Sequence, residues 1–402
     1  MALSRCPSAA SGAPPALTVG VEEEFFLLDR DGLTTSLAPA VLDLLSSPER
    51  FQHEWMQCQI ESATPVCADL PSLATELVAG RRAVAEAAAA TGAVVVASGT
   101  PPCRAGGPMV MTDDERYRRL RARLPGSEDL VTCGCHVHVG VPSRDVGVAV
   151  VNLVSGWLPV LLALGGNSPM WGASDSGWES YRHAVSRRWP TARVAPWCVD
   201  TAEYDAAVAA EIAEARAIDP ASVYWHLRLS PHLPTVEFRV ADVGLTVSDS
   251  LLQAALSRAL VATALTAIAA TGVAPSAEAL TRGGLLDESM TRAARYGVRA
   301  LLLDPSTEAL GPAQWVLRQM IRHLRPALLA AGDWATVTDL LAQRRRRGSG
   351  AQRQRDLRSA SSDRHYVAAL AAASLPSDAP PQPPLGTGEV SHDSGDTPRR
   401  RW

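Results

Sequence analysis

Charged side chains at alternate positions within an apolar segment are the feature that most limits how this chain can fold. Residues 17–29 run from Leu-Thr-Val-Gly-Val through three glutamates to Phe-Phe-Leu-Leu. Apolar residues on both sides predict a strand, and alternate side chains of a strand point to the same face. Glu22 and Glu24 therefore share a face. Burying carboxylates without compensation is costly, so a basic partner or a metal ion is expected beside them.

The same spacing of two recurs in three further predicted strands. Each pair taken alone has a plainer alternative, namely an exposed strand edge that carries charge or an ordinary cross-strand ion pair. Side by side, the strands would form a sheet face bearing carboxylates, imidazoles and an arginine. Such a face suits divalent cations that bridge nucleotide phosphates, with the arginine on the transferred phosphoryl group. The three pairs are Gln59 with Glu61 in residues 57–64, His136 with His138 in 132–141, and Glu237 with Arg239 in 236–240.

The remaining periodicity predicts an α+β fold. Long and unequal helical insertions separate the strands without a regular βαβ rhythm. We expect residues 17–374 to form a single domain, and the Pro- and Ser-rich segments 1–16 and 375–402 to be disordered. The other predicted strands cover 93–98 and 224–229, and the predicted helices cover 71–91, 145–164, 201–218, 248–270, 292–301, 307–331 and 363–373.

The composition excludes several classes of enzyme. The chain of 402 residues contains no lysine, so all 38 of its basic residues are arginine. A P-loop, a protein kinase site and a pyridoxal or aldolase Schiff base each need a lysine. A nucleotide would have to be bound by arginine, histidine, backbone amides and carboxylate-held metal. The net charge of −4 argues against nucleic-acid binding, and the arginine run 344–347 is predicted to be a solvated helix end.

Other features indicate a cytoplasmic protein without a membrane partner. We find no continuous apolar run of the length that crosses a bilayer, and residues 1–15 lack the pattern of a secretory signal. The seven cysteines are scattered, which favours reduced thiols. Cys133, Cys135, His136 and His138 could suggest zinc, but alternation sends the two cysteines and the two histidines to opposite faces. The cysteines are therefore predicted to face the core.

Several segments resemble the successive signatures of the glutamate-cysteine ligase type 2, or carboxylate-amine ligase, family, and they occur in that family's order. The resemblance covers about residues 17–374 and is specific as an ordered set. The segments are TVGVEEEF at 18–25, QIE at 59–61, SGTPP at 98–102, GCHVHVG at 134–140, NSPMW at 167–171, PTVEFRVAD at 234–242, YGVR at 296–299 and GSGAQRQR at 348–355.

The resemblance implies a glutamine synthetase-like catalytic fold, in which helices wrap a curved, mainly antiparallel sheet that holds ATP and Mg²⁺ or Mn²⁺. It implies catalytic roles for Glu237 and Arg239, with Arg239 contacting the transferred phosphoryl group. It also places His138 towards the substrate and Arg182 on the substrate's carboxylate, although a generic surface arginine is the alternative there. The implied metal ligands are Glu22, Glu24, Glu61, His136 and Glu237, with Glu54 a weaker candidate.

The implied activity joins a small-molecule carboxylate, glutamate or another amino acid, to an amine through an acyl phosphate. Two other functions stay open: a guanidino kinase on a related fold, and a metal- or nucleotide-binding regulator without catalysis. Residues 164–171 and 175–179 depart from the family pattern beside the expected substrate pocket, so the actual pair of substrates is open. Whether the chain forms a homo-oligomer is open as well.

Overall fold

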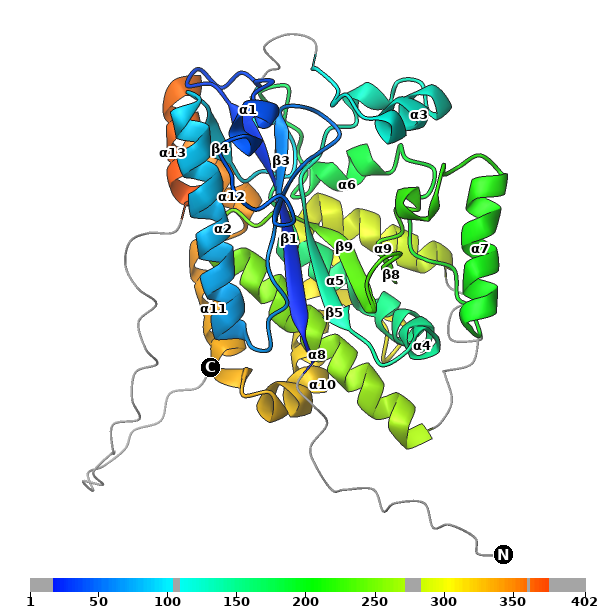
Figure 1. Ribbon diagram of the computed structural model, residues 1–402. Helices are drawn as coiled ribbons and strands as arrows, with labels where there is room; N and C mark the ends of the chain where they lie inside the picture. Colours follow the sequence, from blue (N-terminus) through cyan, green and yellow to red (C-terminus); the bar gives the residue numbers. More distant parts are fainter. Residues whose placement is uncertain (1–16, 104–108, 272–282, 360–361, 376–402) are drawn as a thin grey trace, which may run out of the picture.

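The computed structural model describes residues 17–103, 109–271, 283–359 and 362–375. The predicted disordered N-terminus, and all of the predicted C-terminal tail except residue 375, lie outside the described residues. An antiparallel sheet forms the centre of the protein (Figure 1), with the strand order β2-β3-β1-β5-β9-β8 and with β4 paired to β1. Its strands are β1 Val19–Leu28, β2 Phe51–His53, β3 Gln59–Ala63, β4 Val94–Val96, β5 Gly134–Gly140, β8 Leu227–Leu229 and β9 Thr235–Asp242.

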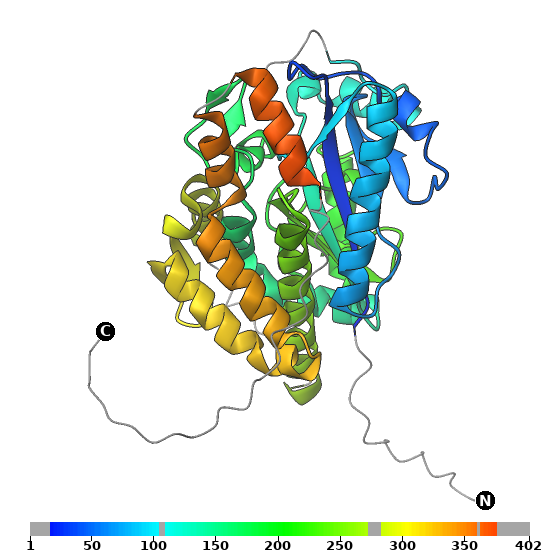
Figure 2. The ribbon, with the colours of Figure 1, turned by 90° about the vertical axis from the view of Figure 1, so that its left-hand side faces the viewer.

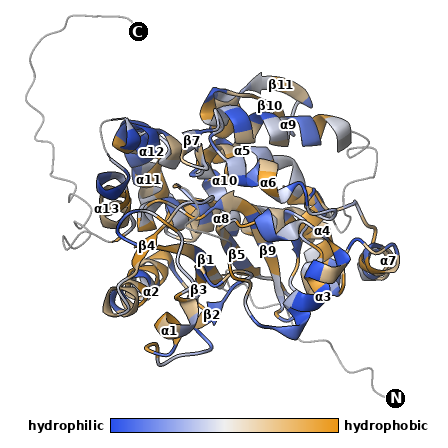
Figure 3. Ribbon diagram, turned by 90° about the horizontal axis from the view of Figure 1, so that it is seen from above, coloured by the Kyte–Doolittle hydropathy of each residue, from blue (hydrophilic) through white to orange (hydrophobic). Residues whose placement is uncertain are grey.

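Helices cover one face of this sheet. Figure 3 shows α8 alongside β1, β5 and β9 with α5 and α10 beyond it, and Figure 2 shows α2 next to β1. Two hairpins complete the described elements, β6 Met170–Trp171 with β7 Ser174–Asp175 and β10 Leu301–Asp304 with β11 Ala309–Pro312. The helices are α1 Ala38–Leu42, α2 Leu70–Ala90, α3 Glu115–Arg123, α4 Arg144–Val154, α5 Leu158–Gly165, α6 Tyr181–Ser186, α7 Thr201–Ala213, α8 Val247–Thr271, α9 Gly283–Tyr296, α10 Ala313–Ala330, α11 Trp334–Arg347, α12 Gly350–Arg358 and α13 Asp363–Ser374.

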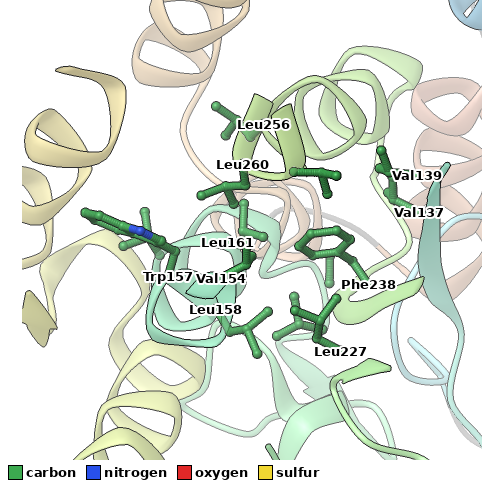
Figure 4. Close-up of a cluster of buried hydrophobic side chains, with 14 of the residues drawn as sticks. Val137, Val139, Val154, Trp157, Leu158, Leu161, Leu227, Phe238, Leu256 and Leu260 are labelled. Atoms are coloured by element: carbon green, nitrogen blue, oxygen red, sulfur yellow. The ribbon is translucent and has the colours of Figure 1, made fainter. Parts of the chain in front are cut away.

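The alternation of the strands sends apolar side chains into a core beneath these helices. Val137 and Val139 of β5 and Phe238 of β9 are buried against Leu161 and Leu256 (Figure 4). Because the pleat has a period of two, the residues between them point to the other face of the sheet. This packing fixes the strands as a rigid base whose second face carries the polar residues.

Two helical stretches are long and apolar enough to cross a membrane by length and composition, Arg144–Gly165 and Val247–Ala270. Of their most apolar windows, 78% and 67% respectively is buried inside the protein. That burial is what core helices show, and the first stretch is interrupted between α4 and α5. The length and composition of these two stretches are therefore weak evidence for a membrane segment.

Several predicted helix boundaries are wrong. The helix expected over 145–164 is broken by a 3₁₀ turn at Ser155–Trp157, after which Pro159 lies in the first turn of α5, where proline is tolerated. The helix expected over 201–218 ends at Ala213. The helix expected over 292–301 begins earlier, at Gly283, and ends at Tyr296, after which Gly297 at φ +54° opens a 3₁₀ turn. The helix expected over 307–331 begins only at Ala313, after the hairpin β10–β11.

Helix α3 is the missed element with most bearing on function. Its sequence is dominated by arginine and only Leu120 is buried, so the apolar periodicity that predicts a helix is nearly absent. Its start is nevertheless defined locally, because the Asp114 side chain accepts hydrogen bonds from the backbone N–H groups of Arg116 and Tyr117. The arginine run 344–347 forms the last turn of α11, as predicted.

Candidate functional site

The strand register brings the predicted polar pairs together on one face. Glu22 lies opposite His136 across the β1–β5 pair, and Glu24 lies opposite Glu61 across the β1–β3 pair. His138 lies opposite Glu237 across the β5–β9 pair. Strand β1 is flanked by β3 and β5 here, so an exposed sheet edge does not explain its glutamates. The expected sheet face is therefore present.

A cavity of ≈ 240 Å³ opens over this face. His138 and Glu237 do not line this cavity. They lie next to Glu22, with which they form a group of potential metal ligands. The walls of the cavity also include two histidines outside the predicted set, His183 and His226. The predicted residues that line the cavity are Glu22, Glu24, Glu54, Glu61, His136, Arg182 and Arg239.

The first cluster consists of Glu22, His138 and Glu237, whose potential ligand atoms lie within 4.8 Å of one another. Burial alone would raise the pKa of Glu22, but His136 and His138 beside it lower that pKa far below its usual range. The pKa of Glu237 is likewise held well below its usual value, against the effect of burial, by Arg239 and Arg228. Both carboxylates are therefore ionised at neutral pH.

The second cluster consists of Glu24, Glu54 and Glu61, also within 4.8 Å of one another. Burial raises the pKa of all three. Neighbouring carboxylates add to the rise at Glu54 and Glu61, and the pKa of Glu61 lies well above its usual value. Glu24 is buried, and Glu54 and Glu61 are half-buried. Arg182 and Arg239 partly offset the charge of Glu24, but Glu24 still raises the pKa of the other two, and a hard divalent cation would neutralise this donor set.

The two predicted histidines lie between these carboxylates. His136 Nδ1 is 3.3 Å from Glu22 and its Nε2 is 3.7 Å from Glu24, while His138 Nε2 is 3.2 Å from Glu22. Neither Nε2 makes a well-formed hydrogen bond within the part of the chain that the structure describes. Burial, and then the charge of Arg239, lower the pKa of His136 to about 4, which leaves the ring neutral and able to bind a metal.

The structure groups the two histidines differently from the sequence-based assignment. His136 was expected among the metal ligands and His138 towards the substrate, whereas the first cluster contains His138 and His136 connects the two clusters. Both assignments stay predictions. Cys133 and Cys135 are buried in the core as predicted, and no cysteine belongs to either cluster in the described ranges.

Arginines supply the positive charge of the site. Glu237 pairs with Arg239 and, at 2.8 Å, with Arg228 on β8. Sequence reasoning missed Arg228, although the segment Leu-Arg-Leu shows the same alternation that marked the other strands. Because both oxygens of Glu237 already accept hydrogen bonds from arginine, this carboxylate aligns Arg239 as well as contributing to the first cluster.

Arg182 is buried, so the alternative of a generic surface arginine is wrong. Its guanidinium donates to the backbone carbonyl of Arg239, while its Nε has no partner among the residues described. The backbone N–H of Arg182 donates to Ser168 Oγ, and Ser168 Oγ donates to the buried Asp242 at 2.7 Å. Asp242 also accepts a hydrogen bond from Ser180. This network fixes Arg182 at the edge of the cavity.

Glu54, the weaker candidate from the family resemblance, lies in the loop between β2 and β3. Two hydrogen bonds from Thr112, which precedes α3, hold the loop between β2 and β3. The backbone N–H of Thr112 donates to the carbonyl of Trp55 at 3.1 Å, and its hydroxyl group donates to the carbonyl of Glu54. The contact is non-local in sequence. It carries Glu54 into the second cluster and ties the cavity wall to the segment that leads into α3.

Comparison with known proteins gives a consistent result. The signature of the family described as "Glutamate-cysteine ligase family 2" matches residues 18–373. A protein of Salinispora tropica with the provisional name glutamate–cysteine ligase 2 is 42% identical over 366 residues, covering 90% of this chain and 96% of its own. A protein of Rhodococcus jostii with a provisional name of the same kind is 39% identical, covering 84% of this chain and 91% of its own.

Two solved structures share the fold at low identity. A bifunctional glutathione synthetase from Pasteurella multocida superimposes with a TM-score of 0.66 at 14% identity, over 89% of this chain and 52% of its own length. This chain therefore spans about half of that bifunctional protein. A glutamate–cysteine ligase from Francisella tularensis, solved with AMP, has a TM-score of 0.65 at 11% identity, over 89% of this chain and 88% of its own. The predicted fold class is confirmed.

Proposed function

The chain belongs to the glutamate-cysteine ligase family 2, and we propose from this membership and its site that it is an ATP-dependent carboxylate–amine ligase. It would join the carboxylate of glutamate or another amino acid to an amine, in the cytoplasm and without nucleic-acid or membrane partners. The names of its relatives and the AMP in the Francisella tularensis structure support a nucleotide-using ligase. Glutamate and cysteine as the actual pair remain part of the proposal.

One observation carries the proposal: two groups of potential metal ligands lie on one sheet face beside Arg239 and a cavity. The residues fit divalent cations, since the pKa of Glu61 is raised well above its usual value by burial and by like charge, and the Nε2 atoms of His136 and His138 lack well-formed hydrogen bonds within the described ranges. Mg²⁺ or Mn²⁺ held there would neutralise phosphate charge. The carboxylate oxygens present in both clusters suit either Mg²⁺ or Mn²⁺.

The chain's own residues would position and stabilise the reacting groups. Arg182 would bind the substrate at the edge of the cavity, and Arg239, aligned by Glu237, would stabilise charge on the transferred phosphoryl group. A substrate carboxylate oxygen attacks the γ-phosphorus of ATP, and ADP leaves. The amine nitrogen then attacks the acyl carbon, phosphate leaves, and the amine releases a proton as the amide forms. No covalent intermediate with the protein is needed.

The test is substrate-dependent release of ADP by the purified protein with ATP and Mg²⁺, followed by mass measurement of the product. An amide product accompanied by ADP and free phosphate is expected. A phosphorylated nitrogen without free phosphate would instead establish the guanidino kinase alternative. An absence of any substrate-dependent ADP release would favour the non-catalytic regulator.

The roles of the glutamates have a separate test. Glu22→Ala and Glu237→Ala are expected to abolish ADP formation while the circular dichroism spectrum stays that of a folded protein. The matched control is Glu86→Ala on α2, outside the cavity and both clusters. Turnover by either variant equal to that of the control would overturn the assigned roles.

A further inference from the structure

The cavity has a second kind of wall that the proposed mechanism does not use. Besides its carboxylates, histidines, arginines and a few uncharged polar residues, the cavity is lined by aromatic and large apolar side chains. These side chains come from the loop after β2, from α3, from the segment between α3 and β5, from the segment after α6 and from the segment before β8. We call them the aromatic wall, and its residues are Trp55, Tyr117, Leu120, Leu130, Trp189 and Tyr224.

The four rings of the aromatic wall form a continuous chain of edge-to-face contacts. The ring centroids of Trp55 and Tyr117 are 5.4 Å apart, those of Trp55 and Trp189 are 6.0 Å apart, and those of Trp189 and Tyr224 are 5.3 Å apart. The corresponding interplanar angles are 89°, 81° and 61°. Edge-to-face packing is a preferred geometry for aromatic rings, and it gives the four rings one continuous surface.

The wall contains a buried donor that lacks a partner in the part of the chain that the structure describes. Trp55 is 7% exposed, and its indole N–H has no hydrogen-bond partner among the described residues. Leaving such a donor unpaired is costly, so a bound molecule with an acceptor at this point would satisfy it. Arg116 beside the wall is already paired with Asp219 at 2.8 Å. The indole N–H is therefore a donor of the wall that a ligand could satisfy.

We propose that the amine substrate of the ligase carries an aromatic or other large apolar group that packs on the aromatic wall, and an oxygen that accepts the Trp55 N–H. The inference rests on the proposed function and deepens it. A thiol-sized side chain would leave most of this apolar surface uncovered, whereas a large group removes it from water. The wall adjoins Glu54 of the second cluster, so a group bound there lies beside the reacting centre.

The experiment separates activation of the carboxylate from selection of the amine. Hydroxylamine captures an acyl phosphate without needing a side-chain subsite, so ATP-dependent hydroxamate formation identifies the acid substrate. With that acid fixed, L-phenylalanine and L-tryptophan are compared with L-alanine and L-cysteine as amines. We expect kcat/KM to be roughly 10- to 100-fold higher for the aromatic amines, the range that a few apolar groups provide in a pocket.

Two variants assign the effect to the wall. Trp189→Leu is expected to lower the ratio of phenylalanine-dependent to hydroxylamine-dependent kcat/KM at least tenfold. The matched control is Trp334→Leu on α11, which lies outside the cavity and packs against Arg325, and its ratio is expected to stay as in the parent protein.

Each other outcome counts against the inference. Equal or better use of cysteine and alanine would overturn it and leave the ligase proposal standing. A rise in the KM for ATP in Trp189→Leu, with the amine ratio unchanged, would assign the wall to the nucleobase. Absence of hydroxamate with every acid tested would instead remove the ligase function on which the inference depends.

Discussion

Neighbouring side chains of β1 point to opposite faces of the sheet and therefore have different roles. Glu22 and Glu24 face the cavity, whereas Glu23 points to the helical face and pairs with Arg81 at 2.5 Å, with both side chains 2% exposed. Ser250 also donates to Glu23. The central glutamate of the three therefore holds the sheet against α2 and α8, and its neighbours serve the site.

Glu23→Gln and Glu61→Gln should have opposite effects on the metal-free protein. Removing the charge of Glu23 leaves Arg81 buried without its ionic partner, at a cost of about 3–5 kcal/mol. Glu61→Gln removes an acid whose folded-state pKa is raised well above its usual value and which therefore costs stability above its ordinary pKa, so the metal-free protein becomes more stable at pH 7. Chemical denaturation with a chelator present measures both. Destabilisation by Glu61→Gln would contradict the account of the second cluster.

At the scale of elements, α3 stands apart from the helices of the core. Only Leu120 of its residues is buried, and the helix is held by its N-terminal cap, by the Arg116–Asp219 pair and by the contact of Tyr117 with Trp55. Helix α8, in contrast, runs through the main core, with Leu256 and Leu260 buried. The cavity is therefore formed by a rigid sheet on one side and a weakly anchored helix on another.

Hydrogen exchange should show this difference. In the free protein, the amides of α3 are expected to exchange much faster than those of β5 and α8, because few buried contacts oppose local opening. ATP, Mg²⁺ and an amine together should slow the amide exchange of α3 and leave the amide exchange of α8 unchanged. Mass spectrometry of peptides covering 115–123 and 250–265 measures this. Equal protection of the two helices in the free protein would be the contrary result.

The stability that the contact between α8 and α12 contributes should depend on pH. Burial alone would raise the pKa of Asp249, but Arg353 at 2.5 Å holds it below the usual value. A lowered folded-state pKa stabilises the protein above the ordinary pKa of aspartate, about 3.9, and the contribution is lost as the pH falls through the lower folded-state value.

Asp249→Asn should therefore destabilise the protein by about 1–3 kcal/mol at pH 7 and by progressively less below about pH 4. Urea unfolding across that pH range, with the exposed Asp43→Asn as control, measures the difference. A cost of Asp249→Asn that does not change with pH would show that the charge of Asp249 is not what stabilises the junction.

At the scale of the whole molecule, binding at the site should stabilise the fold. The clusters draw on β1, β3, β5, β9 and the loop after β2, so a ligand that bridges them joins strands from most of the sheet. ATP with Mg²⁺ at a hundredfold excess over Kd should add about 2.7 kcal/mol to the free energy of unfolding. Glu22→Gln should remove most of that gain and a chelator should reverse it. A full gain in the variant would place the bound metal elsewhere.

The sequence by itself determined which side chains share a face. The strands at 19–28, 59–63, 134–140 and 235–242 were predictable, because an apolar strand with polar residues at alternate positions has only one way to bury its core. The same periodicity separated the cysteines from the histidines and placed carboxylates on one sheet. The ordered motifs then identified the family, and through it the fold class.

Only the tertiary structure decided how those side chains are grouped and what closes the cavity. Register between strands far apart in sequence placed His138 with Glu22 and Glu237, and non-local contacts carried Glu54 into the second cluster. The aromatic wall comes from five separate segments without a shared period. Alternation is a local property of the backbone, whereas register, loop position and cavity shape depend on contacts between distant segments, which no local pattern records.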